Sequence, residues 1–126
     1  MRIAIVGSRN YNFLHQVRKF VRTLPQGTVV VSGGARGVDD IAEREAAKCG
    51  LETKIFPADW DRYGKSAGYK RNVQIVDYSD MIVAFWVAGS KGTRHTIDIA
   101  KDKNKFLMVI DDYDASLVLG GPIWKE

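Results

Sequence analysis

The chain has 126 residues, of which 45% are hydrophobic and 27% are charged. This length and composition are typical of one soluble globular domain, and they exclude a disordered chain and a second full-sized core. No apolar stretch is long enough to span a bilayer, and the start of the chain lacks the cleavage site of a signal peptide. The net charge of +4 favours a partner that carries phosphate, although ordinary solubility would explain so small a charge equally well.

The cysteine and histidine content argues against disulfides and metal sites. Cys49 is the single cysteine, so no internal disulfide can form, and we expect a buried thiol in a reducing cytoplasm. His15 and His95 are far apart and show no metal-ligand spacing, so the sequence predicts neither a metal nor a cofactor.

Short apolar runs alternate with helical periodicities along the chain. Apolar runs predict strands, and apolar residues three or four apart predict helices. The strands are expected at residues 3–6, 28–31, 52–56, 81–87 and 105–110, and the helices at residues 11–24, 38–49, 68–77 and 93–103. Residues 57–67, PADWDRYGKSA, show no period and predict a long loop that is functional or mobile.

The strand runs contain few polar residues, which indicates burial on both faces and therefore a parallel sheet covered by helices. The predicted fold is α/β, a three-layer Rossmann-like domain with a mainly parallel sheet of about five strands. We expect one domain over residues 1–126, with a tail of uncertain structure at 111–126. The apolar stretch 117–124 could be the interface of a homodimer or higher oligomer, or it could cover the edge of the sheet.

Three predicted strands end in turns of small residues that lead into helices. In a parallel sheet these turns lie at one edge, where glycines, bare amides and helix dipoles together attract an anion. The sequence therefore predicts a phosphate-bearing ligand, although each turn alone would be ordinary. The predicted binding residues are Gly7, Ser8, Arg9, Ser32, Gly33, Gly34, Ala35, Arg36, Gly37, Asp39, Gly89, Ser90, Lys91, Gly92 and Thr93.

Two acidic residues follow the second turn, and their roles are left open. Asp39 or Asp40 could accept hydrogen bonds from amides in the first turn of the next helix. One of them could instead accept from a ribose hydroxyl, as acidic residues do in dinucleotide-binding folds.

Four motifs together resemble a known family. They are IAIVGSR at 3–9, SGGARGVDDIAEREA at 32–46, GYKRN at 68–72 and AGSKGTRHTIDIA at 88–100. The chain resembles the SLOG superfamily, which joins the DNA-processing protein DprA (Smf) and the LOG phosphoribohydrolases, and within it the small single-domain YspA-like proteins of the DUF2493 type. The second motif is similar to the DprA pattern Ser-Gly-x-Ala-Arg-Gly-[Ile/Val]-Asp.

This resemblance implies a Rossmann-like fold that binds nucleotides or molecules derived from them. LOG enzymes carry Pro-Gly-Gly-x-Gly-Thr-x-Glu-Glu, whereas residues 88–96 here read AGSKGTRHT, without either glutamate. The match to GYKRN implies a phosphate- or ribose-facing Arg71, with Asn72 beside it. Asp39 and Arg71 are the catalytic candidates that remain if the chain is an enzyme.

The sequence thus favours a cytoplasmic sensor or sequestering module for a nucleotide-like small molecule. A hydrolase of N-glycosidic bonds and a DprA-like single-stranded DNA binder are the alternatives. We rank DNA last because the chain lacks a long basic run or the interleaving of aromatic and basic residues that is expected of such a binder. Trp60, Tyr63 and Tyr69 could stack on a nucleobase or pack the loop onto the sheet.

Overall fold

The structure is a computed structural model in which residues 1–111 are described. A five-stranded sheet forms the centre, in the order β3-β2-β1-β4-β5, and every pairing is parallel. The strands are β1 (Arg2–Gly7), β2 (Val29–Ser32), β3 (Glu52–Ile55), β4 (Met81–Trp86) and β5 (Phe106–Asp111). The predicted α/β class and parallel sheet are therefore confirmed. The apolar stretch 117–124 lies outside the described residues.

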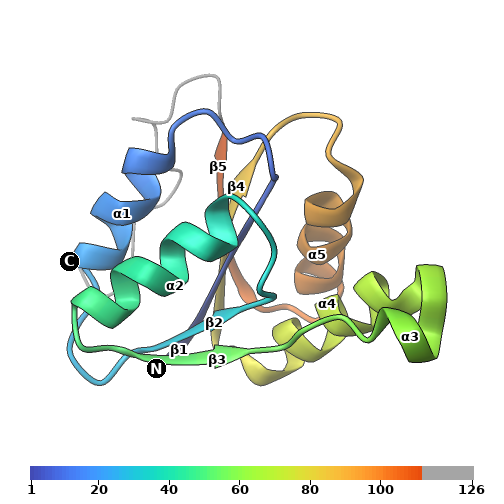
Figure 1. Ribbon diagram of the computed structural model, residues 1–126, viewed down its shortest axis with the longest axis horizontal. Helices are drawn as coiled ribbons and strands as arrows, with labels where there is room; N and C mark the ends of the chain where they lie inside the picture. The colour runs from blue at the N-terminus through green and yellow to red at the C-terminus, as the bar shows by residue number, and fades with distance from the viewer. Residues whose placement is uncertain (112–126) are drawn as a thin grey trace.

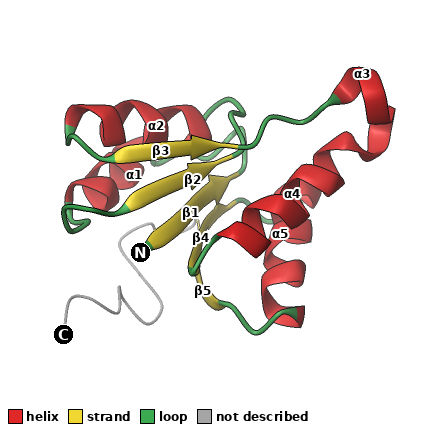
Figure 2. Ribbon diagram, turned by 90° about the horizontal axis from the view of Figure 1, so that it is seen from below, coloured by secondary structure: helices red, strands yellow, loops and turns green. Residues whose placement is uncertain are grey.

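Helices cover both faces of the sheet, which makes three layers (Figure 1). The helical elements are α1 (Leu14–Arg22), α2 (Val38–Lys48), α3 (Trp60–Tyr63), the 3-10 turn η1 (Gly64–Ser66), α4 (Ala67–Tyr78) and α5 (Lys91–Asp102). Helices α1 and α2 lie on one face, and α4 and α5 lie on the other (Figures 1 and 2).

Successive side chains along each strand point to alternate faces of the sheet, so the core has one part on each face. In β1, Ile3 and Ile5 pack under α1 and α2, while Ala4 and Val6 pack under α4 and α5. Successive strand side chains point to opposite faces, so a continuous apolar run is needed when both faces are covered. The apolar runs that predicted the strands have this physical origin.

The segment 57–67, predicted as an irregular loop, instead contains α3 and η1. The Asp59 side chain begins α3 by accepting a hydrogen bond from the Arg62 amide at 3.2 Å. Helix α3 is one turn long, too short to show a 3.6-residue period in sequence. With the start of α4 it forms an arm that projects from the sheet (Figure 2).

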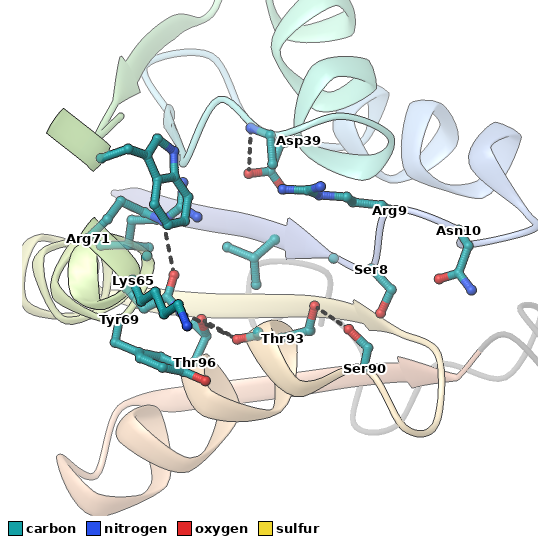
Figure 3. Close-up of a pocket in the computed structure, with 18 residues that line it drawn as sticks. Ser8, Arg9, Asn10, Asp39, Lys65, Tyr69, Arg71, Ser90, Thr93 and Thr96 are labelled. Atoms are coloured by element: carbon teal, nitrogen blue, oxygen red, sulfur yellow. Dashed lines mark hydrogen bonds between the residues drawn. The ribbon is translucent and has the colours of Figure 1, made fainter. Parts of the chain in front are cut away.

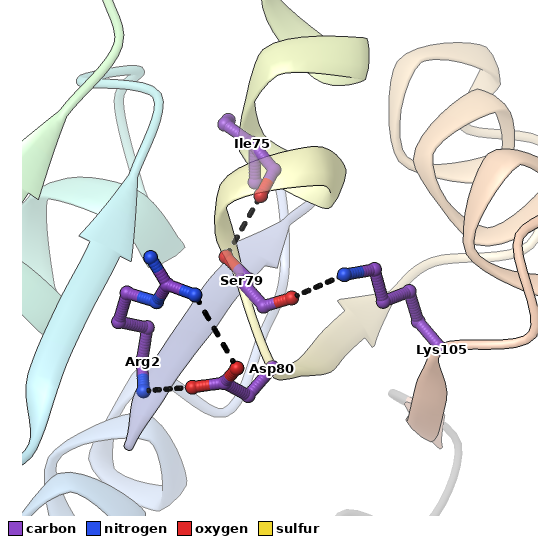
Figure 4. Close-up of polar contacts among 5 residues, drawn as sticks. All are labelled: Arg2, Ile75, Ser79, Asp80 and Lys105. Carbon is purple, nitrogen blue, oxygen red and sulfur yellow. Dashed lines mark hydrogen bonds and ion pairs between the residues drawn. The ribbon is translucent and has the colours of Figure 1, made fainter.

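Polar contacts join the elements at the end of the sheet where the strands begin, opposite the glycine turns (Figure 4). Asp80 accepts a hydrogen bond from the Arg2 amide at 2.8 Å, and Lys105 donates to the Ser79 carbonyl at 2.9 Å. The buried Ser79 hydroxyl donates to the Ile75 carbonyl at 2.7 Å. These contacts fix the starts of β1, β4 and β5 relative to the end of α4.

Candidate functional site

The three glycine turns follow β2, β1 and β4, which are neighbours in the sheet, so the turns lie side by side. The chain leaves β1 for α1 on one face and later returns through α4 to β4 on the other face. The crevice between β1 and β4 is therefore the topological switch point, where ligands of this architecture bind.

The first turn ties β1 to β4. The Ser8 amide donates to the Phe85 carbonyl, and the Ser8 hydroxyl accepts from the Val87 amide, both at 3.0 Å. A Cβ at Gly7 would lie 2.5 Å from Val38 Cγ2 and 2.7 Å from the Phe85 oxygen. Gly7 thus lets α2 approach the sheet, which is a packing role.

The second turn satisfies its own amides. Asp39 Oδ2 accepts from the Gly33 amide at 3.1 Å and from the Ala35 amide at 3.4 Å, and the Gly34 amide donates to the Ser32 hydroxyl at 3.3 Å. Gly34 has a φ of 71°, which curls the turn around the carboxylate. Asp39 therefore bonds the turn before α2 and not the first turn of that helix, and it occupies amides that the sequence suggested for an anion.

The third turn is the open one. The Ser90 amide donates to the Val87 carbonyl at 3.0 Å, and Gly89 adopts a φ of 92°, as the third residue of a type II turn requires. Within residues 1–111, no side chain caps α5 at Ser90, and the first turn of α5 contains no acidic residue. A Cβ at Gly92 would find no heavy atom within 4 Å. The positive end of the α5 dipole thus faces open space.

Arg71 and Asn72 of α4 connect the second turn to α5. Arg71 Nη1 donates to the Gly33 carbonyl at 2.6 Å, and Nε donates to Asn72 Oδ1 at 3.0 Å. Asn72 Nδ2 donates to the Gly92 carbonyl at 3.3 Å and lies 3.2 Å from His95 Nδ1. Since Nδ2 can only donate, His95 Nδ1 is the acceptor, which places the ring proton of neutral His95 on Nε2.

Glycine at position 33 leaves room for the Arg71 side chain in this place. A Cβ there would lie 2.4 Å from Arg71 Nη1. The Gly33 amide and carbonyl thus bind Asp39 and Arg71, respectively, and hold the two charged side chains on either side of one residue.

Burial shifts the pKa values of both charged groups. It raises the pKa of Asp39 to about 6, against the opposing effects of the amides and of Arg71. Burial also lowers the pKa of Arg71; Asp39 opposes this shift and Arg9 adds to it. The two guanidinium groups of Arg9 and Arg71 therefore repel each other across the site, and a bound anion would relieve this repulsion.

A cavity of about 480 Å³, the main cavity, lies over these turns. Figure 3 shows Ser8, Arg9 and Asn10 at one end and Lys65, Tyr69 and Arg71 at the other. Its wall holds three basic side chains, Arg9, Lys65 and Arg71, and one carboxyl, Asp39. Trp60 and Tyr69, which are 54% and 49% exposed as residues, bring aromatic rings to this wall. The combination suits an anion that carries an aromatic group.

The structure divides the predicted binding residues into two groups. Those in the wall of the main cavity are Gly7, Ser8, Arg9, Ala35, Asp39, Arg71, Asn72, Ser90, Gly92 and Thr93. Those outside the wall are Ser32, Gly33, Gly34, Arg36, Gly37, Gly89 and Lys91. Sequence reasoning missed Asn10 and Lys65, which lie outside the four motifs, and Thr96, which lies within the fourth motif. Lys65 belongs to the arm, and its place became visible only with the fold.

The described part of the chain offers little for metal or two-carboxylate chemistry. Within it, no group of three His, Cys, Asp or Glu side chains gathers where a metal could bind, and no helix is long and apolar enough to cross a membrane. Asp39 is the sole carboxyl among the described residues of the cavity wall. Glycosidases that use a pair of carboxylates have no counterpart in that wall.

The family model for DNA recombination-mediator protein A matches residues 1–63. The chain belongs to this family, which confirms the predicted relationship to DprA within SLOG. The Gene 61 protein of Mycobacterium phage D29 is 46% identical over an alignment of 77 residues, and the match covers 56% of this chain and 62% of that protein.

Two solved structures share the fold. DNA processing protein A (DprA) from Streptococcus pneumoniae superposes with a TM-score of 0.76 and 20% identity, covering 98% of this chain and 52% of that one. DNA processing protein A from Helicobacter pylori, studied for its single-stranded DNA binding mode, superposes with a TM-score of 0.66 and 23% identity, covering 87% and 65%. This chain therefore spans less than two thirds of each relative.

Proposed function

We propose that this protein binds single-stranded DNA, with a backbone phosphate at the N-terminus of α5 and a base toward Trp60 and Tyr69. The observation that carries the proposal is the uncapped start of α5, which faces a cavity with three basic side chains and one carboxyl. The family relationship and the DNA-binding relative from Helicobacter pylori support it.

The phosphate position follows from the differences among the turns. The Gly33 and Ala35 amides already bind Asp39, so a second anion there would meet a carboxylate. At α5 the amides of the first turn, the Ser90 and Thr93 hydroxyls and the helix dipole all favour negative charge.

Gly92→Asp tests this position with little risk to the fold. The new side chain enters open space, and a carboxylate in the first turn of a helix stabilises that helix by about 0.3–1 kcal/mol. The same carboxylate would repel a phosphate. We expect unchanged or higher thermal stability together with at least about tenfold weaker binding of a fluorescent oligothymidylate, measured by anisotropy.

Gly92→Asn is the matched control, because it has the same size without the charge. It should bind DNA more tightly than the Asp variant. Equal affinities of the two variants would show that no phosphate lies at α5, and an oligonucleotide that fails to bind the unmodified protein would refute the function itself.

A free nucleotide as the natural ligand is the second candidate. The volume of about 480 Å³ favours it, because pockets for small molecules have this size. Calorimetry with nucleotides, cyclic nucleotides and ADP-ribose derivatives distinguishes the two. A nucleotide that binds more tightly than any oligonucleotide would make the protein a sensor or sequestering module.

A further inference from the structure

A second cavity of about 480 Å³ lies between the arm and the helix α4 that follows it, with walls from α3 and α4. We call it the arm groove; its walls include Arg62, Tyr63, Lys70, Arg71, Val73 and Gln74. Arg71 also lines the main cavity, so one side chain is shared by both. Helix α3 stands between them, with Trp60 in the wall of the main cavity and Tyr63 in that of the groove.

The groove holds more positive than negative charge, because its wall includes Arg62, Lys70 and Arg71 but one carboxyl, Asp59. The Arg62 guanidinium lies 5.1 Å and the Lys70 ammonium 4.7 Å from the centre of the Tyr63 ring. Within residues 1–111, neither cation forms an ion pair. The Asp59 carboxylate also lines the groove, where its Oδ1 accepts from the Arg62 amide at 3.2 Å and its charge offsets part of that of the cations.

Two cations held against one ring repel each other, and an anion between them would reduce that repulsion. Tyr63 as a residue is 39% exposed even with both cations against its ring, so the side chain lies at the surface of the groove. Phosphates that alternate with flat bases match this alternation of cations and aromatic rings.

We propose that the arm groove binds the backbone of the nucleotides that follow the one held in the main cavity, so that the protein grips a strand across its arm. This inference rests on the proposed function. Arg71 contacts the strand where it passes from one cavity to the other. Affinity therefore increases with the length of the oligonucleotide beyond the first nucleotides.

The test compares a thymidine dinucleotide with an oligothymidylate of about twelve nucleotides, a length that single-strand binding domains cover. The double variant Arg62→Ala/Lys70→Ala removes both groove cations. We expect it to bind the long oligonucleotide about five- to tenfold more weakly and the dinucleotide as well as before. The slope of log affinity against log salt should fall by about 1.4, since each phosphate contact on a single strand contributes about 0.7.

The control is Lys19→Ala/Lys48→Ala, which removes the same charge from exposed positions on α1 and α2. It should leave affinity for both oligonucleotides nearly unchanged. Equal losses in the two double variants would overturn the groove as a site, because net charge alone would explain them. A loss for the dinucleotide as large as for the long strand would also overturn it.

The two proposals fail in different ways. Unmodified protein that binds neither oligonucleotide refutes the proposed function and the groove together. Unmodified protein that binds both equally well, with no gain from length, refutes the groove and leaves the main cavity as the DNA site.

Discussion

Replacing Asp39 by asparagine should stabilise the protein at neutral pH, although Asp39 accepts two hydrogen bonds. Both amides donate to one oxygen, Oδ2, and the side-chain oxygen of asparagine can take that place. The variant removes a charge that is costly to bury, since Asp39 is only 4% exposed.

The size of the effect follows from the pKa. Burial raises the pKa of Asp39 from 3.8 to about 6. Each pKa unit corresponds to about 1.4 kcal/mol, so the folded state should lose about 3 kcal/mol when this carboxyl ionises. The attraction of Arg71 is already contained in this net shift.

The dependence on pH has a definite direction. Below the ordinary value of 3.8 the carboxyl is protonated in the folded and the unfolded state, and this contribution to stability is fully present. Between 3.8 and about 6 the unfolded state ionises first, so stability falls as pH rises. Above about 6 the loss is complete. The free energy of unfolding of Asp39→Asn should therefore be about 3 kcal/mol larger than that of the unmodified protein at neutral pH and equal to it in acid.

Urea unfolding followed by circular dichroism between about pH 4 and pH 8 gives this difference directly. Subtracting the unfolding free energies of the two proteins at each pH cancels the contributions of the other titrating groups. These include His95, whose pKa burial lowers. Asp40→Asn is the control, because Asp40 lies next in α2, is 46% exposed and pairs with Arg44. Its effect should stay below about 1 kcal/mol. An Asp39→Asn protein that is less stable at neutral pH would show that the charged form is favoured, and the argument would fail.

Two further predictions concern the scaffold. Gly7→Ala should destabilise the protein by about 3 kcal/mol in urea unfolding, because its Cβ would overlap Val38 and the Phe85 carbonyl; a loss below about 1 kcal/mol would contradict this packing role. Asp80→Asn should lower stability at neutral pH by less than about 1 kcal/mol, since the pair with Arg2 is half exposed. The hydrogen bond from the Arg2 amide lowers the pKa of Asp80, so the loss of stability in the variant should disappear as pH falls through that pKa. A loss that stays constant with pH would argue against a stabilising role of the ionised Asp80 carboxylate.

The fold could be predicted because its signals are local. The apolar runs of β1 and β4 exist because both sheet faces are covered, and the glycine turns follow strands that are neighbours. Helix α3 was not predicted because a helix of one turn shows no period, although Asp59 is of a residue type that favours the position before a helix.

The site could be predicted only in outline. The sequence indicated glycine-rich turns at one edge, and the sheet order places them there. It could not show that Asp39 would reach back to Gly33, which depends on the left-handed conformation of Gly34. Nor could it show that Arg71 binds a carbonyl 38 positions away, because such contacts depend on tertiary packing.

The proposed arrangement assigns different tasks to the sheet edge and the arm. The α5 N-terminus acts through fixed amides and a dipole, which set the position of one phosphate. The arm acts through exposed cations, whose contribution arises largely from released counterions and falls steeply with salt. Loss of groove cations should therefore change the salt slope, whereas Gly92→Asp should weaken binding at every salt concentration. This contrast separates a strand held at two places from one that merely lies on a basic surface.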